Sequence, residues 1–222
     1  MSPANPQHVG RSLAWKRAFD LGLTLIVLPV VLPLAVLVAV AVRLALGSPV
    51  LFTQERPGRN REPFRLYKFR TMTDRTDPSG ALLPDSDRLT AFGRFLRTTS
   101  LDELPQLWNV LIGDMSLVGP RPLLMRYLPA FTEEESQRFE VRPGITGLQQ
   151  VTGRNLHAWD TRLAKDVEYA QRCSLRLDLW ILFRTVVVVL TREGLQVDPG
   201  AVALDLDEER RVRADAKASS NE

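Results

Sequence analysis

Residues 21–42 carry no charged side chain over 22 positions, an apolar run long enough to cross the hydrocarbon core of a bilayer as a helix. Two features argue against a simple span. Pro29 and Pro33 lie in the middle of the run, where each removes a helical hydrogen bond and Pro33 would force a kink. Basic residues also flank both ends of the run, although the positive-inside rule expects basic flanks on the cytoplasmic side only.

The sequence therefore leaves two alternatives for this segment: a spanning helix, and a re-entrant helix that leaves the membrane on the side where it entered. From Asp20 to Pro33 the chain covers 13 residues, or about 20 Å of helix, against about 30 Å of hydrocarbon. Each arm of a helix broken near Pro33 would thus enter the bilayer without crossing it. A cleaved signal peptide is disfavoured, because the run is longer than the apolar core of a typical signal sequence.

The rest of the chain has the size and composition of one moderate domain. The 222 residues are 45% hydrophobic, and the lone Cys173 cannot form an intramolecular disulfide. Residues 1–204 carry 25 basic and 20 acidic side chains, a modest excess that suits an anionic membrane surface or phosphate-bearing substrates. We expect no nucleic-acid partner, because the sequence shows no basic stripe with interleaved aromatic residues. The oligomeric state is open, and a homodimer is one candidate.

Hydrophobic periodicity predicts a mostly helical α/β fold with a small β-hairpin. Residues 49–54 and 64–70 are candidate strands, joined through the turn at Gly58. Apolar residues at helical spacing predict helices within residues 89–96, 104–111, 156–172 and 175–191. The last of these is apolar but interrupted by charges, which favours a buried helix or an amphipathic helix at the membrane interface.

Residues 100–122 (SLDELPQLWNVLIGDMSLVGPRP) hold the strongest signal for chemistry. The adjacent carboxylates of Asp102 and Glu103 suit a nucleophile beside a ligand for a divalent metal. Arg121 lies between two prolines that fix its backbone, and its planar guanidinium can bind two phosphate oxygens at once. An acid pair, an implied metal and a phosphate-binding arginine together indicate phosphoryl transfer.

The same acids also have a structural explanation. The run from Ser100 to Glu103 fits a capping box, in which these two side chains satisfy backbone donors at a helix start. Pro105 complicates this interpretation, because it lies where the helix would begin to use its amide donors. The two explanations can hold together, since the donors of a helix N-terminus also attract phosphate oxygens.

Two rival functions remain at this stage. Asp85-Ser86-Asp87 matches the D-x-D motif of metal-dependent glycosyltransferases, although the motif is short and falls in a polar loop. A membrane-anchored scaffold without activity would use its acids only as helix caps. Among the candidate phosphate ligands, Lys68 could equally be a solvated strand residue. Arg142 and Arg154 could be surface residues beside turns, but both lie in Gly-rich loops of the kind that approach phosphates.

Taken together, these runs resemble the bacterial sugar transferase family, specifically its small monotopic phosphoglycosyl transferases. The matching runs keep the family's order over residues 15–190: KRAFD (16–20), FTQERPG (52–58), FRLYKFRTM (64–72), the 100–122 run, RPGITGLQQVTGRN (142–155) and SLRLDL (174–179). The resemblance implies a re-entrant helix, a compact cytosolic α/β domain and helices that lie at the membrane interface. The expected organisation is an N-terminal arm (1–14), the re-entrant helix (15–47), a catalytic domain (48–200) and a charged, disordered tail (201–222).

The resemblance also implies a reaction. A sugar-1-phosphate passes from a UDP-sugar to polyprenol (undecaprenyl) phosphate with release of UMP, the first membrane step in making a glycoconjugate such as exopolysaccharide or O-antigen. The enzyme would work among membrane lipids on the cytoplasmic face of the bacterial inner membrane, with both termini cytosolic. Asp102 matches the catalytic nucleophile that attacks the β-phosphate. Glu103 matches the adjacent acid associated with Mg²⁺, so the implied metal ligands are Glu103 and Asp102.

Further positions match the family or depart from it. Cations that the family needs for activity, through phosphate contacts, are matched by Lys68, Arg97 and Arg121. Asp178 matches a further family acid whose role the sequence does not reveal. Pro33 matches the helix-breaking proline, which favours the re-entrant alternative, with Pro29 as a second contributor. The chain departs at Leu32, where the family often has Ser, and at residues 148–150 (LQQ), where many members carry an aromatic residue.

Overall fold

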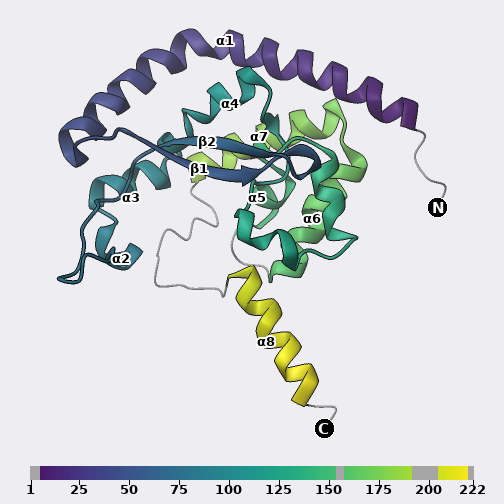
Figure 1. Ribbon diagram of the computed structural model, residues 1–222. Helices are drawn as coiled ribbons and strands as arrows, with labels where there is room; N and C mark the ends of the chain where they lie inside the picture. Colours follow the sequence, from purple (N-terminus) through teal and green to yellow (C-terminus); the bar gives the residue numbers. More distant parts are fainter. Residues whose placement is uncertain (1–5, 154–157, 192–204, 220–222) are drawn as a thin grey trace.

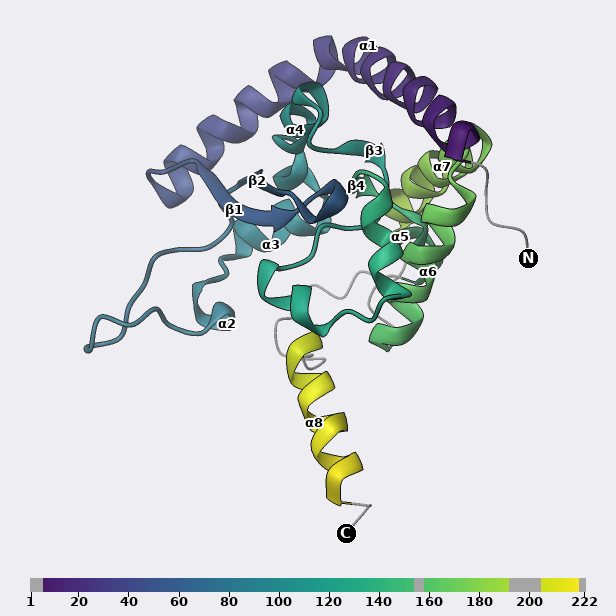
Figure 2. The ribbon, with the colours of Figure 1, turned by 45° about the vertical axis from the view of Figure 1, so that its right-hand side comes forward.

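The computed structural model describes residues 6–153, 158–191 and 205–219. It is mostly helical, as the sequence predicts, and it has two small two-stranded sheets, of which the sequence predicts only the hairpin. The long helix α1 (Pro6–Leu46) arches over a compact domain, and α8 (Leu206–Ser219) projects from the opposite side of that domain (Figures 1 and 2). The domain between these two helices carries every described residue that we expect to contact substrate.

Short strands, 3-10 turns and helices alternate through this domain. The strands are β1 (Leu51–Pro57), β2 (Pro63–Phe69), β3 (Ser116–Val118) and β4 (Gly144–Thr146). The helices are α2 (Asp85–Arg88), α3 (Ala91–Thr98), α4 (Gln106–Ile112), α5 (Leu148–Gly153), α6 (Trp159–Arg172) and α7 (Leu175–Thr191). The 3-10 turns are η1 (Arg59–Arg61), η2 (Leu101–Glu103), η3 (Met125–Ala130) and η4 (Glu135–Glu140). All four predicted helices are present, as α3, α4, α6 and α7.

The antiparallel hairpin of β1 and β2 confirms the predicted pair of strands. Side chains of directly paired residues in antiparallel strands point to the same face of the sheet. On one face the pairs are Phe52 with Lys68, Gln54 with Leu66, and Arg56 with Phe64. Because Phe64 and Leu66 belong to the core, this face looks into the domain and carries Lys68 near one end and Arg56 near the other.

The second sheet is parallel and brings the loop after β3 and the loop before β4 together by close backbone contact. Val118 of β3 pairs with Thr146 of β4, and the Gly119 amide donates to the Thr146 carbonyl at 2.8 Å. A Cβ atom on Gly119 would lie 2.3 Å from the carbonyl oxygen of Arg142, and one on Gly144 would lie 2.0 Å from the amide nitrogen of Gly119. Only glycine allows this approach, so the turn that leads to Arg121 rests directly on β4.

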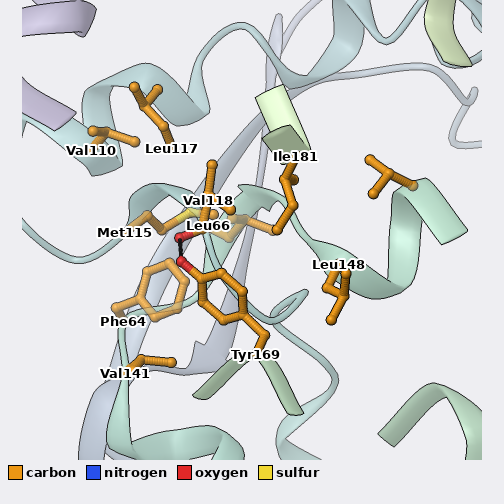
Figure 3. Packing of buried hydrophobic residues seen from close by; sticks show 11 residues of the cluster. Phe64, Leu66, Val110, Met115, Leu117, Val118, Val141, Leu148, Tyr169 and Ile181 are labelled. Carbon is orange, nitrogen blue, oxygen red and sulfur yellow. Dashed lines mark hydrogen bonds between the residues drawn. The ribbon is translucent and has the colours of Figure 1, made fainter. Parts of the chain in front are cut away.

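The main core lies between the hairpin, the parallel sheet and helices α4 to α7 (Figure 3). Its members include Leu66 of β2, Met115, Val118 of β3 and Ile181 of α7. Tyr169 of α6 is fully buried in this cluster, and its hydroxyl donates to the Val118 carbonyl at 2.9 Å, as the dashed line in Figure 3 shows. A buried tyrosine hydroxyl needs such a partner, and here it ties α6 to the strand beside the site.

The N-terminal part of α1 is fixed to the domain by a buried ion pair. Lys16 Nζ lies 2.6 Å from Asp178 Oδ2, and the exposed fractions of these side chains are 8% and 1%. The Tyr169 hydroxyl also lies 2.7 Å from the other Asp178 oxygen, so its single proton is shared between Asp178 and the Val118 carbonyl. Asp178, whose role the sequence did not reveal, therefore joins α1, α6 and α7 rather than facing Asp102.

Two further residues of the KRAFD run hold α1 against the domain. Arg17 donates to the backbone carbonyls of Val110 and Leu111 near the end of α4. The last carbonyls of a helix have no amide donor within that helix, so a side chain can serve as their partner. Asp20 accepts a hydrogen bond from the Ser116 hydroxyl of β3 at 2.7 Å. The charged run at the start of the membrane helix thus serves as its attachment to the domain.

The C-terminal part of α1 also packs on the domain, whereas the middle does not. Val38 and Val42 are buried in a cluster with Phe69 and Leu96. Between the two attachments, apolar side chains are more than half exposed, among them Leu25, Ile26, Val30 and Leu32. Residues Ala14–Leu46 are long and apolar enough to cross a membrane, and only 11% of their most apolar window is buried.

The expected break of α1 near Pro33 is corrected by the structure. The helix runs without interruption from Pro6 to Leu46 and includes both Pro29 and Pro33. It bends in its middle part instead, so that its two ends descend toward the domain (Figures 1 and 2). A proline bends a helix without ending it when the flanking turns keep their hydrogen bonds.

The charged tail is also corrected for the residues that the structure describes. Residues 201–222 were expected to be disordered, yet Leu206–Ser219 form helix α8. Leu206 is fully buried against Tyr127 and Trp159, and Asp205 accepts a hydrogen bond from the Tyr127 hydroxyl at 2.6 Å. The prediction of disorder followed the high charge density of the tail and did not consider the single apolar contact made by Leu206 at its start.

Candidate active site

Asp102 and Glu103 lie on turn η2, between α3 and α4. The leucines on either side of them, Leu101 and Leu104, pack into the apolar cluster that contains Val38 of α1. These anchors leave both carboxylates on the side of β2, where they meet Lys68. The turn therefore holds the acid pair between the membrane helix and the hairpin.

The predicted capping box is not formed. Ser100 adopts the left-handed conformation, with φ 57° and ψ 17°, and its side chain caps no amide of the described turn. The Glu103 carboxylate binds Lys68 and Arg121 instead of the Ser100 backbone. Side-chain cations rather than helix backbone donors hold this acid, so the structural explanation of the motif is wrong.

Glu103 is a firmly ionised carboxylate. Lys68 Nζ donates to Glu103 Oε1 at 2.6 Å, and Arg121 Nη2 donates to the same oxygen at 3.1 Å. Burial alone would raise the pKa of Glu103, but the charges of Lys68 and Arg121 outweigh burial and lower the pKa to about 2. Its negative charge is therefore permanent at physiological pH.

Asp102, the neighbouring acid, has the opposite environment. Its side chain is 10% exposed, and its closest cation is Lys68, whose Nζ lies 4.0 Å from Asp102 Oδ2. Burial, and then the charge of Glu103, raise the pKa of Asp102 to about 6, against opposing effects of Lys68 and two arginines. No described residue donates a hydrogen bond to this carboxylate, so its oxygens are available to a substrate.

Arg97 reaches the site because α3 docks closely on the end of the hairpin. A Cβ atom on Gly93 would lie 1.8 Å from the Thr71 carbonyl oxygen, so only glycine permits this approach. Arg97 lies one turn further along α3, where its Nε donates to the Thr71 hydroxyl at 3.0 Å. Burial lowers the pKa of Arg97, and the nearby Asp102 opposes that effect.

Arg121 is positioned through its backbone as well as through its flanking prolines. Arg138 Nη2 donates to the Arg121 carbonyl at 2.7 Å, and the same nitrogen lies 2.7 Å from Asp166 Oδ2 in a fully buried pair. The Arg121 side chain is 42% exposed, which leaves part of its guanidinium accessible beyond Glu103. Arg121 can thus bind Glu103 and an anionic ligand together.

The structure brings five of the predicted site residues together and places others elsewhere. The residues that converge are Lys68, Arg97, Asp102, Glu103 and Arg121. Arg142 instead donates to the Gly113 carbonyl at 2.8 Å, next to the attachment of α1. Residues 148–150 are buried in α5, so they offer no surface for stacking a base. Arg154 lies outside the described residues.

Two arginines that the sequence did not single out lie beside Arg121. Burial, followed by the charge of Arg121, lowers the pKa of Arg56 to about 10. The same two causes, in the same order, lower the pKa of Arg162 of α6. Arg56 belongs to the FTQERPG run, which was a usable signal, whereas Arg162 stands in a helix whose pattern shows only amphipathicity.

The acid pair fits a magnesium ion that arrives with a diphosphate. Asp102 and Glu103 are hard oxygen ligands, and Mg²⁺ is often held by one or two carboxylates together with substrate phosphates. Within residues 6–153, 158–191 and 205–219 no three or more acidic, histidine or cysteine side chains converge as a complete metal site. Asp85, from the rival D-x-D motif, is 68% exposed and lies 3.5 Å from Arg88.

Comparison with known proteins identifies the family of this chain. A family model described as bacterial sugar transferase matches residues 11–192. The uncharacterised sugar transferase EpsL of Bacillus subtilis is 54% identical over 181 residues, which are 82% of this chain and 90% of that protein.

Two relatives carry a named activity. The UDP-glucose:undecaprenyl-phosphate glucose-1-phosphate transferase of Caulobacter vibrioides is 42% identical over 189 residues, 81% of this chain and 71% of that protein. The undecaprenyl-phosphate galactose phosphotransferase of Salmonella typhimurium is 40% identical over 196 residues, but this chain spans only 41% of its length. With a family match over most of its length, this chain belongs to the bacterial sugar transferase family.

Proposed function

We propose that this protein transfers a sugar-1-phosphate from a UDP-sugar to undecaprenyl phosphate and releases UMP. Relatives named for that reaction support the substrate classes. The observation that carries the proposal is the Asp102 carboxylate, buried and without a hydrogen bond from any described residue, among Lys68, Arg97 and Arg121. A nucleophile surrounded by cations suits attack on a phosphorus atom whose oxygens gain charge.

In the first half of the reaction, an Asp102 oxygen attacks the β-phosphorus of the UDP-sugar. The new O–P bond forms as the bond to the bridging oxygen breaks, and UMP leaves with the bonding electrons. Arg121 and Arg97 stabilise the charge on the phosphoryl oxygens, and Lys68 keeps Glu103 in place. The product is an aspartyl phosphosugar, which separates the steps that use the soluble donor and the lipid acceptor.

In the second half, a phosphate oxygen of undecaprenyl phosphate attacks the same phosphorus atom. The bond to Asp102 breaks, the carboxylate is regenerated, and the lipid diphosphate-sugar leaves. Mg²⁺, when held by Glu103 and Asp102, would neutralise charge on the diphosphate. The reaction is balanced by the two substrates alone and needs no oxidant, reductant or water.

We further propose that α1 is re-entrant and that both termini are cytosolic. Two attachments support this topology, since the start and the end of α1 both pack on the same domain while the middle is exposed. Helix α7 adds a second exposed apolar surface, with Leu179, Phe183 and Leu190 all more than half exposed. Immersion of these surfaces would hold the acid pair near the headgroups, where a polyprenol phosphate presents its phosphate.

A labelling experiment tests the covalent mechanism. Wild-type protein incubated with a radiolabelled UDP-sugar, without lipid, should release UMP and retain labelled sugar phosphate, and steady-state kinetics should be ping-pong. Asp102→Asn should show neither label nor turnover. The matched control is Asp87→Asn, which should keep most activity because it changes an acid of the exposed rival motif. Kinetics that require both substrates bound together, with no label, would contradict the mechanism.

A further inference from the structure

We propose that Arg56, acting beside Arg121, binds the phosphate of the departing nucleotide, and that the adjoining groove between β1 and η3 receives the nucleoside. This inference rests on the proposed function, because it assigns the leaving half of the UDP-sugar to residues beyond the acid pair. It makes Arg56 a substrate-binding residue of a subsite that lies across Arg121 from Asp102.

The hairpin register supplies the direction of this subsite. Lys68 and Arg56 lie on the same inward face of the hairpin, with one pair of that face, Gln54 and Leu66, between them. Lys68 binds the acid pair, and Arg121 contacts that pair from the other side. Arg56 Nη1 approaches the carbonyl oxygen of Pro122, the residue after Arg121, at 3.4 Å. The side chains thus run in the order Lys68, acid pair, Arg121, Arg56.

Arg56 is held in place without a carboxylate partner among the described residues. Its Nη2 donates to Gln54 Oε1 at 2.6 Å, which orients the guanidinium, and its Nε is buried without an acceptor within the described structure. An unpaired buried donor is costly, so Arg56 keeps unused hydrogen-bonding capacity next to Arg121. The pKa of Arg56, lowered by burial and by Arg121, is consistent with a cation that awaits a counter-charge.

The cations around Arg121 carry more positive charge than the acid pair neutralises, which favours the binding of a further anion. Cations outnumber carboxylates there: Lys68, Arg97, Arg121, Arg56 and Arg162 face Asp102 and Glu103, while Arg138 is neutralised by Asp166. The excess is three positive charges when Asp102 is ionised, and a Mg²⁺ ion held by the acid pair would add two more. A diphosphate diester, with one negative charge on each phosphate, would offset two of these charges. The phosphate attacked by Asp102 and the phosphate that leaves would then meet different cations.

A groove lies between β1 and η3, near Arg56. It has a volume of about 420 Å³ and is lined by Gln54, Glu55, Leu124, Met125 and Arg126. Gln54 is the residue that orients Arg56, and Leu124 follows Pro122 by two positions, so the groove lies close to the Arg56 guanidinium. Its size lies within the range of small-ligand sites, and Leu124, Met125 and the Gln54 amide suit a nucleoside, between the charged side chains of Glu55 and Arg126.

Product binding tests this assignment independently of turnover. The affinity of UMP would be measured by thermal stabilisation of the purified, detergent-solubilised protein, with uridine and inorganic phosphate as separate probes. Arg56→Ala should weaken UMP binding by about 10- to 100-fold, the range expected for loss of a charge-assisted hydrogen bond. Arg56→Lys should restore part of the affinity. Arg65→Ala, an exposed arginine on the opposite face of the same hairpin, is the matched control and should leave UMP affinity unchanged.

A second variant isolates the groove. Leu124→Trp would fill it, and should weaken binding of UMP and uridine while leaving that of inorganic phosphate unchanged. The KM for the UDP-sugar should rise in both Arg56→Ala and Leu124→Trp, with little change in the KM for the lipid acceptor. UMP affinity that is equal in wild type, Arg56→Ala and Leu124→Trp, with the fold intact, would overturn the inference. If Arg56→Ala does not fold, unchanged UMP affinity in Arg56→Lys and Leu124→Trp would overturn it equally.

The transferase function and the nucleotide subsite can be tested separately. If wild-type protein transfers sugar phosphate to lipid but binds UMP independently of Arg56, the transferase proposal stands and the subsite is wrong. If wild-type protein makes no lipid product with any UDP-sugar, the transferase function is wrong whatever Arg56 does.

Discussion

At the scale of single residues, two neighbouring acids have opposite electrostatic environments. Lys68 and Arg121 both contact Glu103 and lower its pKa to about 2. Asp102 is buried beside that permanent negative charge, and its pKa rises to about 6. Environments that make the pKa values of two neighbouring titratable groups differ strongly are typical of active sites, where each group has its own role. The pair therefore divides into an acid anchored by two cations and a buried acid without a hydrogen bond from any described residue, which suits the role proposed for Asp102.

We predict that Asp102→Asn stabilises the folded protein while abolishing transfer. The folded-state pKa of Asp102 lies above its unfolded value of 3.8, so the ionised form opposes folding above about pH 6 and this cost fades as the pH falls toward 4. Asparagine removes the cost, which should raise stability by about 1–3 kcal/mol at pH 8 and by little near pH 4.

Thermal unfolding at pH 8 and at pH 4, without nucleotide or metal, measures this difference. Glu103→Gln is the informative comparison, because it deletes a charge that two cations hold and should destabilise the protein at neutral pH. A capping role for Asp102 would give the opposite sign, a modest loss of stability with activity retained.

At the scale of elements, short helices and turns carry the site because glycine contacts and buried pairs fix them. Helix α3 meets the chain at Thr71 through Gly93, which sets the position of Arg97. The β3 turn rests on β4 through Gly119, which sets the position of Arg121. The positions of Arg97 and Arg121 therefore depend on close backbone contacts elsewhere in their elements.

Gly93→Ala should displace α3 and impair catalysis. The new methyl group would lie 1.8 Å from the Thr71 carbonyl oxygen, a contact with backbone that can be relieved only by moving the helix. We expect a loss of stability of about 1–3 kcal/mol and a larger fall in kcat than in donor affinity. Gly22→Ala in α1 is the control, since a Cβ atom there meets nothing within 4 Å. Equal behaviour of the two variants in unfolding and turnover would contradict this role of Gly93.

The Lys16–Asp178 pair should act as a clamp for α1 rather than as part of the chemistry. Asp178→Ala would leave the buried Lys16 with Asp20, 3.9 Å away, as its remaining carboxylate partner, so the loss of stability should not exceed the cost of about 3–5 kcal/mol that is typical of breaking a buried pair. The double variant Lys16→Met/Asp178→Leu should be less destabilised than the two single variants added together. A double-mutant cycle by denaturant unfolding measures this coupling. Loss of activity in Asp178→Ala at full stability would instead place Asp178 in the reaction.

At the scale of the whole molecule, the arch of α1 links the candidate site to the long apolar stretch of the chain. Both arms of the helix pack on the domain, and the exposed apolar stretch lies between them. Turn η2, which bears the acid pair, packs on the second arm through Leu101 and Leu104. The depth of the helix in the bilayer would therefore fix the height of Asp102 above it.

We predict that both sides of the apolar stretch face the cytosol. Single cysteines introduced as His8→Cys and Asn60→Cys, each in a Cys173→Ser background, should be protected from membrane-impermeant reagents in intact cells and labelled after lysis. A spanning helix would expose one of the two positions to the outside. Labelling of position 8 alone in intact cells would contradict the re-entrant topology.

How much of this protein can be predicted from its sequence depends on the range of the interactions involved. The apolar run, the hairpin and the helices at 89–96, 104–111, 156–172 and 175–191 follow from local periodicity, because side-chain spacing alone decides which face is buried. Asp102, Glu103 and the proline-flanked Arg121 could be proposed as site residues from the sequence, because they lie in one short motif whose residue types suit phosphoryl transfer.

Only the tertiary structure decided what depends on distant contacts. The capping box does not form because the Glu103 carboxylate binds Lys68 and Arg121, which lie 35 and 18 residues away in the sequence. Asp178 became a clamp because Lys16 reaches it over 162 residues of sequence. The hairpin brings Arg56 to the carbonyl of Pro122, next to Arg121. Leu206 fixes the start of α8 by packing on Tyr127 and Trp159. Such pairings depend on energies realised only when the chain is folded, which local sequence patterns do not encode.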